Sequence, residues 1–175
     1  MGSNPAGNEV TGSVQPSTTR SLRSRLVAAL KTMGLPVCLM ESKLLLMSSY
    51  LAVACGSAIG GMLRFALAGW LMRVAGGNFP WGTLAVNVAG CALIGMLEVV
   101  FPPEQKGFPW RLFWLPGVCG GFTTFSAFGL ETYGLWRTGT SDRAFIYIGA
   151  SVVLCLLAVW CGISLTSRFT GNSSN

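Results

Sequence analysis

Four stretches of this chain carry no charged residue and are long enough to cross a membrane. They are residues 44–63, 74–97, 112–130 and 144–167, of 20, 24, 19 and 24 residues. A helix rises about 1.5 Å per residue, so about 20 apolar residues cross about 30 Å of hydrocarbon. The pattern predicts an all-α membrane protein with four transmembrane helices, over about residues 44–72, 80–101, 111–136 and 144–167.

Four spans place both ends of the transmembrane domain on one side of the membrane, and the flanking cations decide which side. The side of the termini has Lys43, Lys106, Arg111 and Arg168, and the other side has Arg73, Arg137 and Arg143. Four against three is a near tie. It is compatible with a weakly biased bundle whose termini are cytoplasmic, and with dual topology, in which copies insert both ways up and pair antiparallel.

The composition excludes several classes of protein. Hydrophobic residues make up 51% of the chain and charged residues 10%, whereas soluble domains carry about 25% charged residues. The net charge of +6 comes from scattered Lys and Arg, which gives nucleic-acid binding little support. Histidine is absent, and the six cysteines have no C-x-x-C spacing, which argues against hydrolase chemistry and zinc sites. We expect no enzymatic activity.

The first 41 residues differ from the rest of the chain. Residues 1–41 are a polar and basic extension, 42–169 the four-helix transmembrane domain and 170–175 a polar tail. The extension is compatible with a disordered segment that includes an amphipathic surface helix, with a targeting segment, or with a start assigned too early. The third interpretation is slightly favoured, because Met33, Met40 and Met47 all lie shortly before the first span.

Polar side chains recur at helical spacing inside the second and fourth spans. Thr83, Asn87 and Cys91 are four residues apart, and so are Tyr147, Ser151 and Cys155. Each set lies on one helical face. An amide within a membrane must form hydrogen bonds, and the NH2 of Asn87 suits either an interhelical bond or an anion.

The first span combines small residues with one cation. Gly56 and Gly60 form a G-x-x-x-G pair, which permits close helix contact. Arg64 ends the apolar run that contains them. This arginine is either an interfacial side chain that reaches the lipid headgroups or a source of positive potential at an anion entrance.

The third span is a poor continuous helix. Gly120-Gly121 and Thr123-Thr124 interrupt its apolar run and predict a break in mid-membrane. Backbone carbonyls freed by a break can bind a small cation. Phe125 and Phe128 follow, with Ser126 between them, and the electropositive edges of aromatic rings can face an anion. Glu131, one turn further on, suits a proton relay or a carboxylate at headgroup level.

Three motifs resemble the Fluc or CrcB family of small fluoride channels. They are GGMLRF at 60–65, GTLAVNVAG at 82–90 and GGFTTFSAF at 120–128, and the likeness extends over about residues 45–168. The resemblance implies a fluoride-selective channel in the plasma membrane or bacterial inner membrane, where it releases toxic fluoride passively. It also implies an antiparallel, dual-topology homodimer with a structural sodium ion between the two broken third helices. Pairing with a second homologue is an alternative.

The resemblance also implies roles for individual residues. The backbone carbonyls of Gly120 and Thr123 would bind sodium. The proposed fluoride pore residues are Thr83, Asn87, Phe125, Ser126, Phe128, Tyr147 and Ser151, and Arg64 and Glu131 match positions at the pore entrance or with structural roles. Ala127 and Cys155 depart from the family pattern, because a hydroxyl residue is common at each position.

The main alternative is a small proton-coupled exporter of drugs or other cations, which also has four spans. That class needs a carboxylate within the membrane as its coupling site. None lies in residues 44–72, and Glu98 and Glu131 both lie toward the ends of spans. The fluoride channel is therefore the preferred interpretation.

Overall fold

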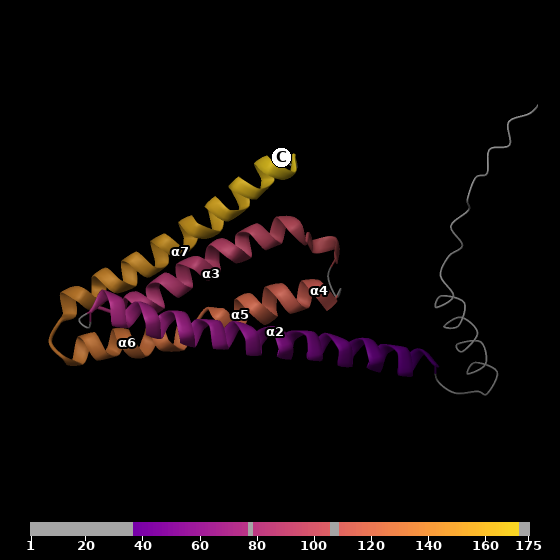
Figure 1. Cartoon of the computed structure of the whole chain (residues 1–175), viewed down its shortest axis with the longest axis horizontal. Coiled ribbons are helices and arrows are strands. Elements are labelled where there is room, and N and C mark those ends of the chain that lie inside the picture. Colours follow the sequence, from indigo (N-terminus) through magenta and orange to yellow (C-terminus); the bar gives the residue numbers. More distant parts are fainter. Residues whose placement is uncertain (1–36, 77–78, 106–108, 172–175) are drawn as a thin grey trace, which may run out of the picture. The chain divides into compact units, whose positions relative to one another are not determined.

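The computed structural model describes residues 37–76, 79–105 and 109–171, and in these residues every regular element is a helix (Figure 1). The chain divides into two compact units, Met1–Leu44 and Leu45–Asn175. All the residues proposed for the site lie in the second unit. Most of the extension at 1–41 lies outside the described residues, as does most of the tail at 170–175.

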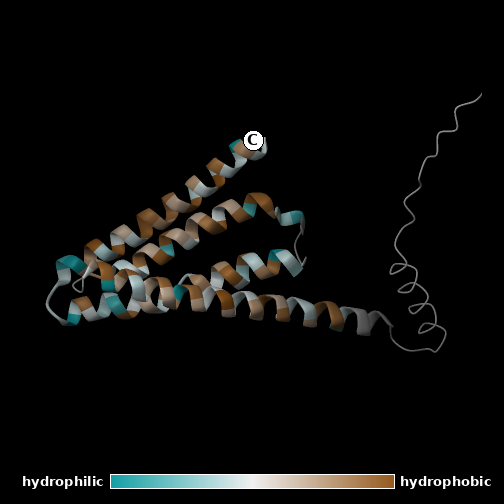
Figure 2. Cartoon of the chain, viewed as in Figure 1, coloured by the Kyte–Doolittle hydropathy of each residue, from teal (hydrophilic) through white to brown (hydrophobic). Residues whose placement is uncertain are grey.

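Three long helices account for three of the four expected spans. They are α2 (Val37–Ala75), α3 (Trp81–Val100) and α7 (Ser141–Thr170). Each contains a stretch long and apolar enough to cross a membrane. Figure 2 shows apolar residues along all three, with hydrophilic residues near the ends of α6 and α7. The protein is therefore a multi-pass membrane protein.

The third expected span, 111–136, is a series of shorter helices. These are α4 (Pro109–Leu112), the π-helical η2 (Phe113–Cys119), α5 (Gly120–Phe122) and α6 (Phe125–Arg137). Pro116 lies within η2, and because proline has no backbone N–H, it cannot complete regular α-helical bonding. Thr123 and Thr124, between α5 and α6, have extended backbone conformations. No single α-helix therefore covers this part of the chain.

Helices α3 and α7 run in the same direction and pack with backbones in close contact (Figure 1). A Cβ added to Gly95 would meet the carbonyl of Val159, and one added to Gly162 would meet the carbonyl of Ala92. Only glycine fits at these two positions without a shift of one helix. The contact holds the facing residues of α3 and α7 in a fixed register.

Glycines also allow α2 to approach η2 and α5. A Cβ on Gly56 would lie 2.9 Å from Cα of Gly117, and one on Gly121 would lie 2.8 Å from Cα of Ser57. One added to Gly60 would collide with the carbonyl of Val118. The G-x-x-x-G pair of the first span therefore permits close packing against η2 and α5, as its spacing predicted.

An ion pair joins the end of α3 to α4. Between these two helices lies a short 3-10 helix, η1 (Pro103–Gln105). The guanidinium of Arg111 donates to Glu98 at 2.8 and 3.0 Å and to the carbonyl of Phe101 at 3.0 Å. The arginine is half-buried, so the pair is partly shielded from water. This arrangement fixes the corner at which the chain turns into the third span.

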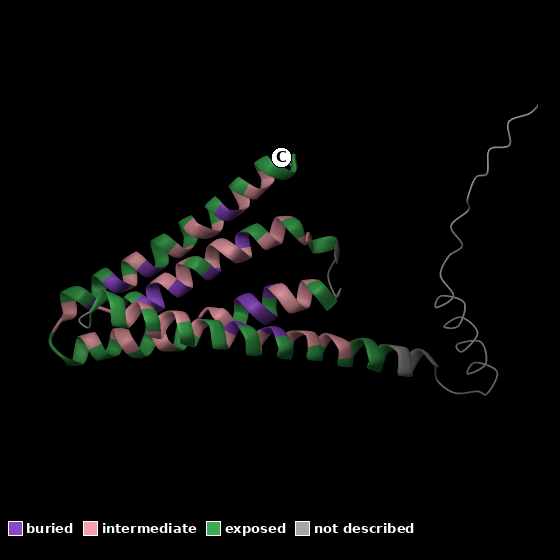
Figure 3. Cartoon of the chain, in the orientation of Figure 1, coloured by how far each residue is buried: buried purple, intermediate pink, exposed green. Residues whose placement is uncertain are grey.

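Few side chains of the single chain are buried (Figure 3). The buried hydrophobic residues are Leu84, Val86, Leu115, Val118, Cys119, Ala144 and Tyr147. Large apolar side chains such as Phe65, Phe125 and Trp160 are exposed. In a membrane protein such faces meet lipid or another subunit.

Candidate functional site

The extended segment between α5 and α6 is bound to α3 by one side chain. The carboxamide of Asn87 accepts a hydrogen bond from the backbone N–H of Thr124 at 2.7 Å and donates one to the backbone carbonyl of Thr124 at 3.0 Å. The spacing of the second span left Asn87 equally suited to an interhelical bond and to an anion. The structure places it in the interhelical bond, which engages one of its two amide hydrogens and leaves the other for a ligand.

Thr124 also starts α6. Its hydroxyl accepts a hydrogen bond from the backbone N–H of Ala127 at 3.2 Å, the arrangement of an N-cap, and lies 3.2 Å from the hydroxyl of Ser126. The side chain is buried, with 8% of its surface exposed. Thr124 was named in the sequence only as part of the predicted break, yet it organises this region.

These bonds redirect the backbone donors that a continuous helix would use. In a continuous α-helix, the N–H of Thr124 would donate to the carbonyl of Gly120, four residues earlier. The N–H of Ala127 would likewise donate to the carbonyl of Thr123. Both N–H groups are instead engaged by Asn87 and by the Thr124 hydroxyl. The carbonyls of Gly120 and Thr123 are the two expected to bind sodium, and neutral oxygens are ligands suited to a hard cation.

Glu131 connects α3 to α7. The hydroxyl of Thr83 donates to one oxygen of its carboxylate and the hydroxyl of Tyr147 to the other, each at 2.7 Å. Thr83 and Tyr147 are buried, and Glu131 is half-buried. The carboxylate thus has a partner on each of its two oxygens within the bundle. Its level in the membrane and a role as a proton relay both stay predictions.

Aromatic rings form a row beside the break. The ring centroids of Phe125 and Phe128 are 5.3 Å apart, and those of Phe128 and Tyr147 are 5.1 Å apart. Phe79 packs edge-on against Tyr147 at 5.5 Å. Phe125 is 83% exposed, so the single chain leaves most of this ring available to an ion or a second subunit.

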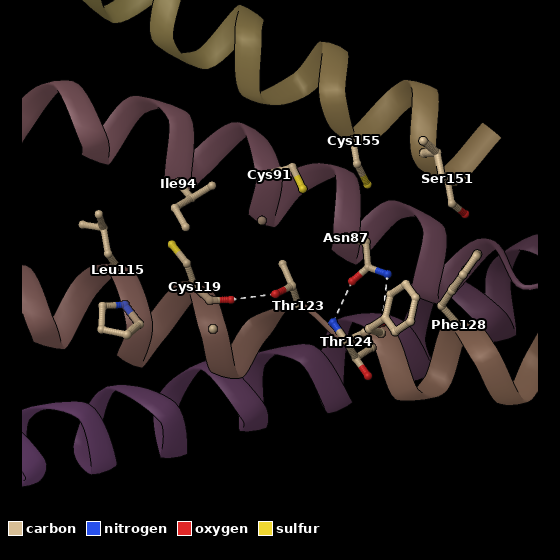
Figure 4. A pocket seen from close by; sticks show the side chains of 15 residues that line it. Asn87, Cys91, Ile94, Leu115, Cys119, Thr123, Thr124, Phe128, Ser151 and Cys155 are labelled. Atoms are coloured by element: carbon tan, nitrogen blue, oxygen red, sulfur yellow. Dashed lines mark hydrogen bonds between the residues drawn. The ribbon is translucent and has the colours of Figure 1, made fainter. Parts of the chain in front are cut away.

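A cavity of about 600 Å³ lies between α3, α7 and the broken third span (Figure 4). It includes Asn87, Thr123, Phe125, Phe128 and Ser151 among its lining residues. The hydroxyl of Ser151 is buried and has no hydrogen-bond partner among the described residues. A buried hydroxyl without a partner is costly, so this group is suited to bind a ligand in the cavity.

A second cavity, of about 540 Å³, also has Thr124 in its lining. Arg64, Thr83, Ser126 and Glu131 line it. Thr124 lines both cavities, so the pair that it forms with Asn87 lies at the boundary between them. Arg64 is half-buried and lines this cavity together with residues that carry hydroxyl groups.

The polar residues expected in α3 and in α7 face each other in register. Each polar residue of α7 follows its counterpart in α3 by 64 positions, in the pairs Thr83 and Tyr147, Asn87 and Ser151, and Cys91 and Cys155. The same separation relates Gly95 to Val159, whose backbones are in contact. Thr83 and Tyr147 share Glu131, and the next pairs, Asn87 with Ser151 and Cys91 with Cys155, line the first cavity. The structure therefore joins the two stripes into one polar seam.

Three features of the structure were not predicted from the sequence. Thr124 immediately precedes a helix, which is where threonine commonly caps, and this signal would have identified it. Pro116 is a signal for irregular backbone within the third span, but a proline alone does not predict a π-helical turn. The Arg111–Glu98 pair joins two predicted spans and could not be read from spacing along either.

Comparison with known proteins gives a consistent result. The family described as "CrcB-like protein, Camphor Resistance (CrcB)" matches residues 51–163. A relative from Paramagnetospirillum magneticum is 46% identical over 119 residues, which cover 66% of this chain and 93% of the relative. A relative from Agrobacterium fabrum is 47% identical over 65% of this chain and 91% of its own length. A relative from Opitutus terrae is 48% identical over 66% of this chain and 90% of its own length. All three are named fluoride-specific ion channel FluC.

Proposed function

The chain belongs to the CrcB family, and on that premise we propose that it is a fluoride-selective ion channel, not an enzyme, which lets fluoride leave the cell passively. The observation that carries the proposal is the match to relatives named as fluoride-specific channels over about nine-tenths of their length. This match favours the channel over the proton-coupled exporter. The membrane would be the plasma membrane, or the inner membrane of a bacterium with two.

The polar seam suits the chemistry of fluoride. Fluoride is small and strongly hydrated, so a selective pore must replace water with several donors in a narrow path. The free amide hydrogen of Asn87 and the hydroxyls of Ser126 and Ser151 are neutral donors, and they bind an anion weakly enough to release it. The ring edges of Phe125 and Phe128 add partial positive charge beside them.

Arg64 and Glu131 would act at the entrance of the path. Arg64 lines the second cavity with Ser126, so its charge raises the local concentration of anions there. Glu131 holds the hydroxyls of Thr83 and Tyr147 in fixed orientations. The path that we propose runs from the second cavity, past Thr124, into the first.

The carbonyls of Gly120 and Thr123 fit a structural sodium ion. Their usual helical donors are engaged elsewhere, and neutral oxygens are ligands for a hard cation. When bound, sodium would supply positive potential near the pore without contacting the anion. Asn87 and the Thr124 hydroxyl would keep the backbone between α5 and α6 out of the helical conformation that would occupy these carbonyls.

We propose that the active form is an antiparallel homodimer. The near tie of flanking cations is compatible with insertion in both orientations. Phe125 is exposed in the single chain, and a second copy would cover it and complete the first cavity. Reconstitution of this chain alone separates a homodimer from a pair with a different homologue, since only a homodimer conducts without a partner.

Ion efflux from liposomes tests the function. The full chain is reconstituted, a potassium ionophore removes the opposing voltage, and release of fluoride is compared with release of chloride. We expect rapid release of fluoride and retention of chloride. Equal release of the two anions, or no release from liposomes that hold folded dimer, would refute the proposal of a fluoride-selective homodimer.

A further inference from the structure

Three cysteines converge on the first cavity. Cys91 comes from α3, Cys119 from η2 and Cys155 from α7, and all three are free thiols that line the cavity. Figure 4 shows the side chains of Cys91 and Cys155 in the space between their two helices. None of the three takes part in the fluoride chemistry proposed above.

Cys91 and Cys155 are a pair because of the register of α3 and α7. They occupy the third step of the polar seam, one helical turn beyond Asn87 and Ser151. Both side chains lie on the faces of α3 and α7 that line the cavity. In the described part of the chain, no group of three or more Cys, Asp or Glu side chains is arranged to hold a metal ion. A cation bound between these side chains would be held by the two thiols.

We propose that Cys91 and Cys155 bind a soft monovalent cation of the class of Ag⁺ and Cu⁺, and that this cation obstructs the cavity. Such cations select sulfur ligands, whereas zinc sites need four ligands or three with water. One thiol loses its proton to water and becomes a thiolate, while the other binds through its neutral sulfur. The charges of thiolate and cation cancel, which suits a largely apolar cavity.

The obstruction rests on the proposed function, since it assumes that fluoride crosses this cavity. The bound cation would lie within the cavity, one helical turn from Asn87 and Ser151. This chain would therefore be more sensitive to soft cations than a channel that carries serine in place of Cys155.

Residue-resolved alkylation tests the binding itself. The full chain in detergent is treated with iodoacetamide at increasing Ag⁺, and labelling of each cysteine is read by mass spectrometry. We expect Ag⁺ to protect Cys91 and Cys155 together. Replacement of either thiol, Cys91→Ala or Cys155→Ser, should raise the half-protecting concentration for the other by at least about tenfold. The exposed Cys161 lies outside the cavity, and Cys161→Ala should leave the protection unchanged.

Fluoride efflux tests the obstruction, in nitrate buffers because Ag⁺ precipitates chloride. Ag⁺ should slow efflux at least about tenfold in the wild type and in Cys161→Ala, and about tenfold more Ag⁺ should be needed in Cys91→Ala and Cys155→Ser. Each rate is compared with that of the same variant without Ag⁺. Independent protection of the two thiols, or efflux unaffected by Ag⁺, would overturn the proposal. Absence of efflux before Ag⁺ is added would count against the proposed function instead, and the labelling would still report on the site.

Discussion

Removal of the Asn87 side chain should destabilise the fold at the break. In Asn87→Ala, the backbone N–H and carbonyl of Thr124 both lose their partner. Thr124 is buried and its backbone is extended, so neither group can return to a helical bond without a change of conformation. The substitution therefore leaves two polar groups of the main chain unpaired within the bundle.

The magnitude follows from these two bonds. Hydrogen bonds inside membrane proteins contribute about 0.6 kcal/mol on average and up to about 1.7 kcal/mol, because the unfolded chain in a membrane also finds partners. The bonds of Asn87 are short, at 2.7 and 3.0 Å, and serve groups that have no helical alternative. A value of about 1 kcal/mol for each gives a loss of about 2 kcal/mol in the free energy of unfolding, or about 30-fold in the equilibrium constant.

Unfolding by dodecyl sulfate in mixed micelles, followed by circular dichroism, measures this loss. The matched control is Thr132→Val, which removes a hydroxyl that donates to the carbonyl of Phe128 within α6. We expect a change below about 0.5 kcal/mol in the control, because the carbonyl stays within a continuous helix. A wild-type midpoint for Asn87→Ala, or an equal loss in the two variants, would refute the role assigned to the Asn87–Thr124 pair.

Three further predictions follow from other parts of the structure. Phe125→Ile should abolish fluoride efflux, because it removes the ring edge proposed to face the anion, and should leave the dimer intact on size-exclusion chromatography; unchanged efflux would contradict the role of the ring. Glu131→Gln should slow efflux by about tenfold, because one of the two hydroxyls bound to the carboxylate loses its acceptor; a wild-type rate would show that orienting them is unnecessary. Gly56→Val should prevent recovery of monodisperse protein, because its side chain would meet backbone atoms of η2, whereas Gly129→Ala, with nothing within 4 Å of the new Cβ, should be recovered normally.

The pattern of apolar residues predicted the helices well. The spans expected at 80–101 and 144–167 correspond to α3 and α7, and α2 contains the whole of 44–72. Hydropathy predicts such spans because any backbone in lipid must satisfy its own hydrogen bonds. The spacing of four also identified the residues of the polar seam, because it reports directly which side chains share a helical face.

The partners of those residues could not be predicted. Spacing placed Asn87 on a face, but its bonds to Thr124 depend on how α3 meets the break. Glu131 was expected near the end of a span, and only the packing of α3, α6 and α7 gives it two hydroxyl donors. Contacts between helices depend on the register in which they pack, and that register is set by glycines such as Gly95 and Gly162.

The close contact of α3 with α7 has a mechanical consequence. With Gly95 against Val159 and Gly162 against Ala92, the two backbones leave no layer of side chains that could adjust between them. Interfaces packed this closely resist deformation, so α3 and α7 would move as one stiff body. Any widening or narrowing of the first cavity must then come from the opposite wall, which the third span forms and where the backbone at Thr123 and Thr124 is extended.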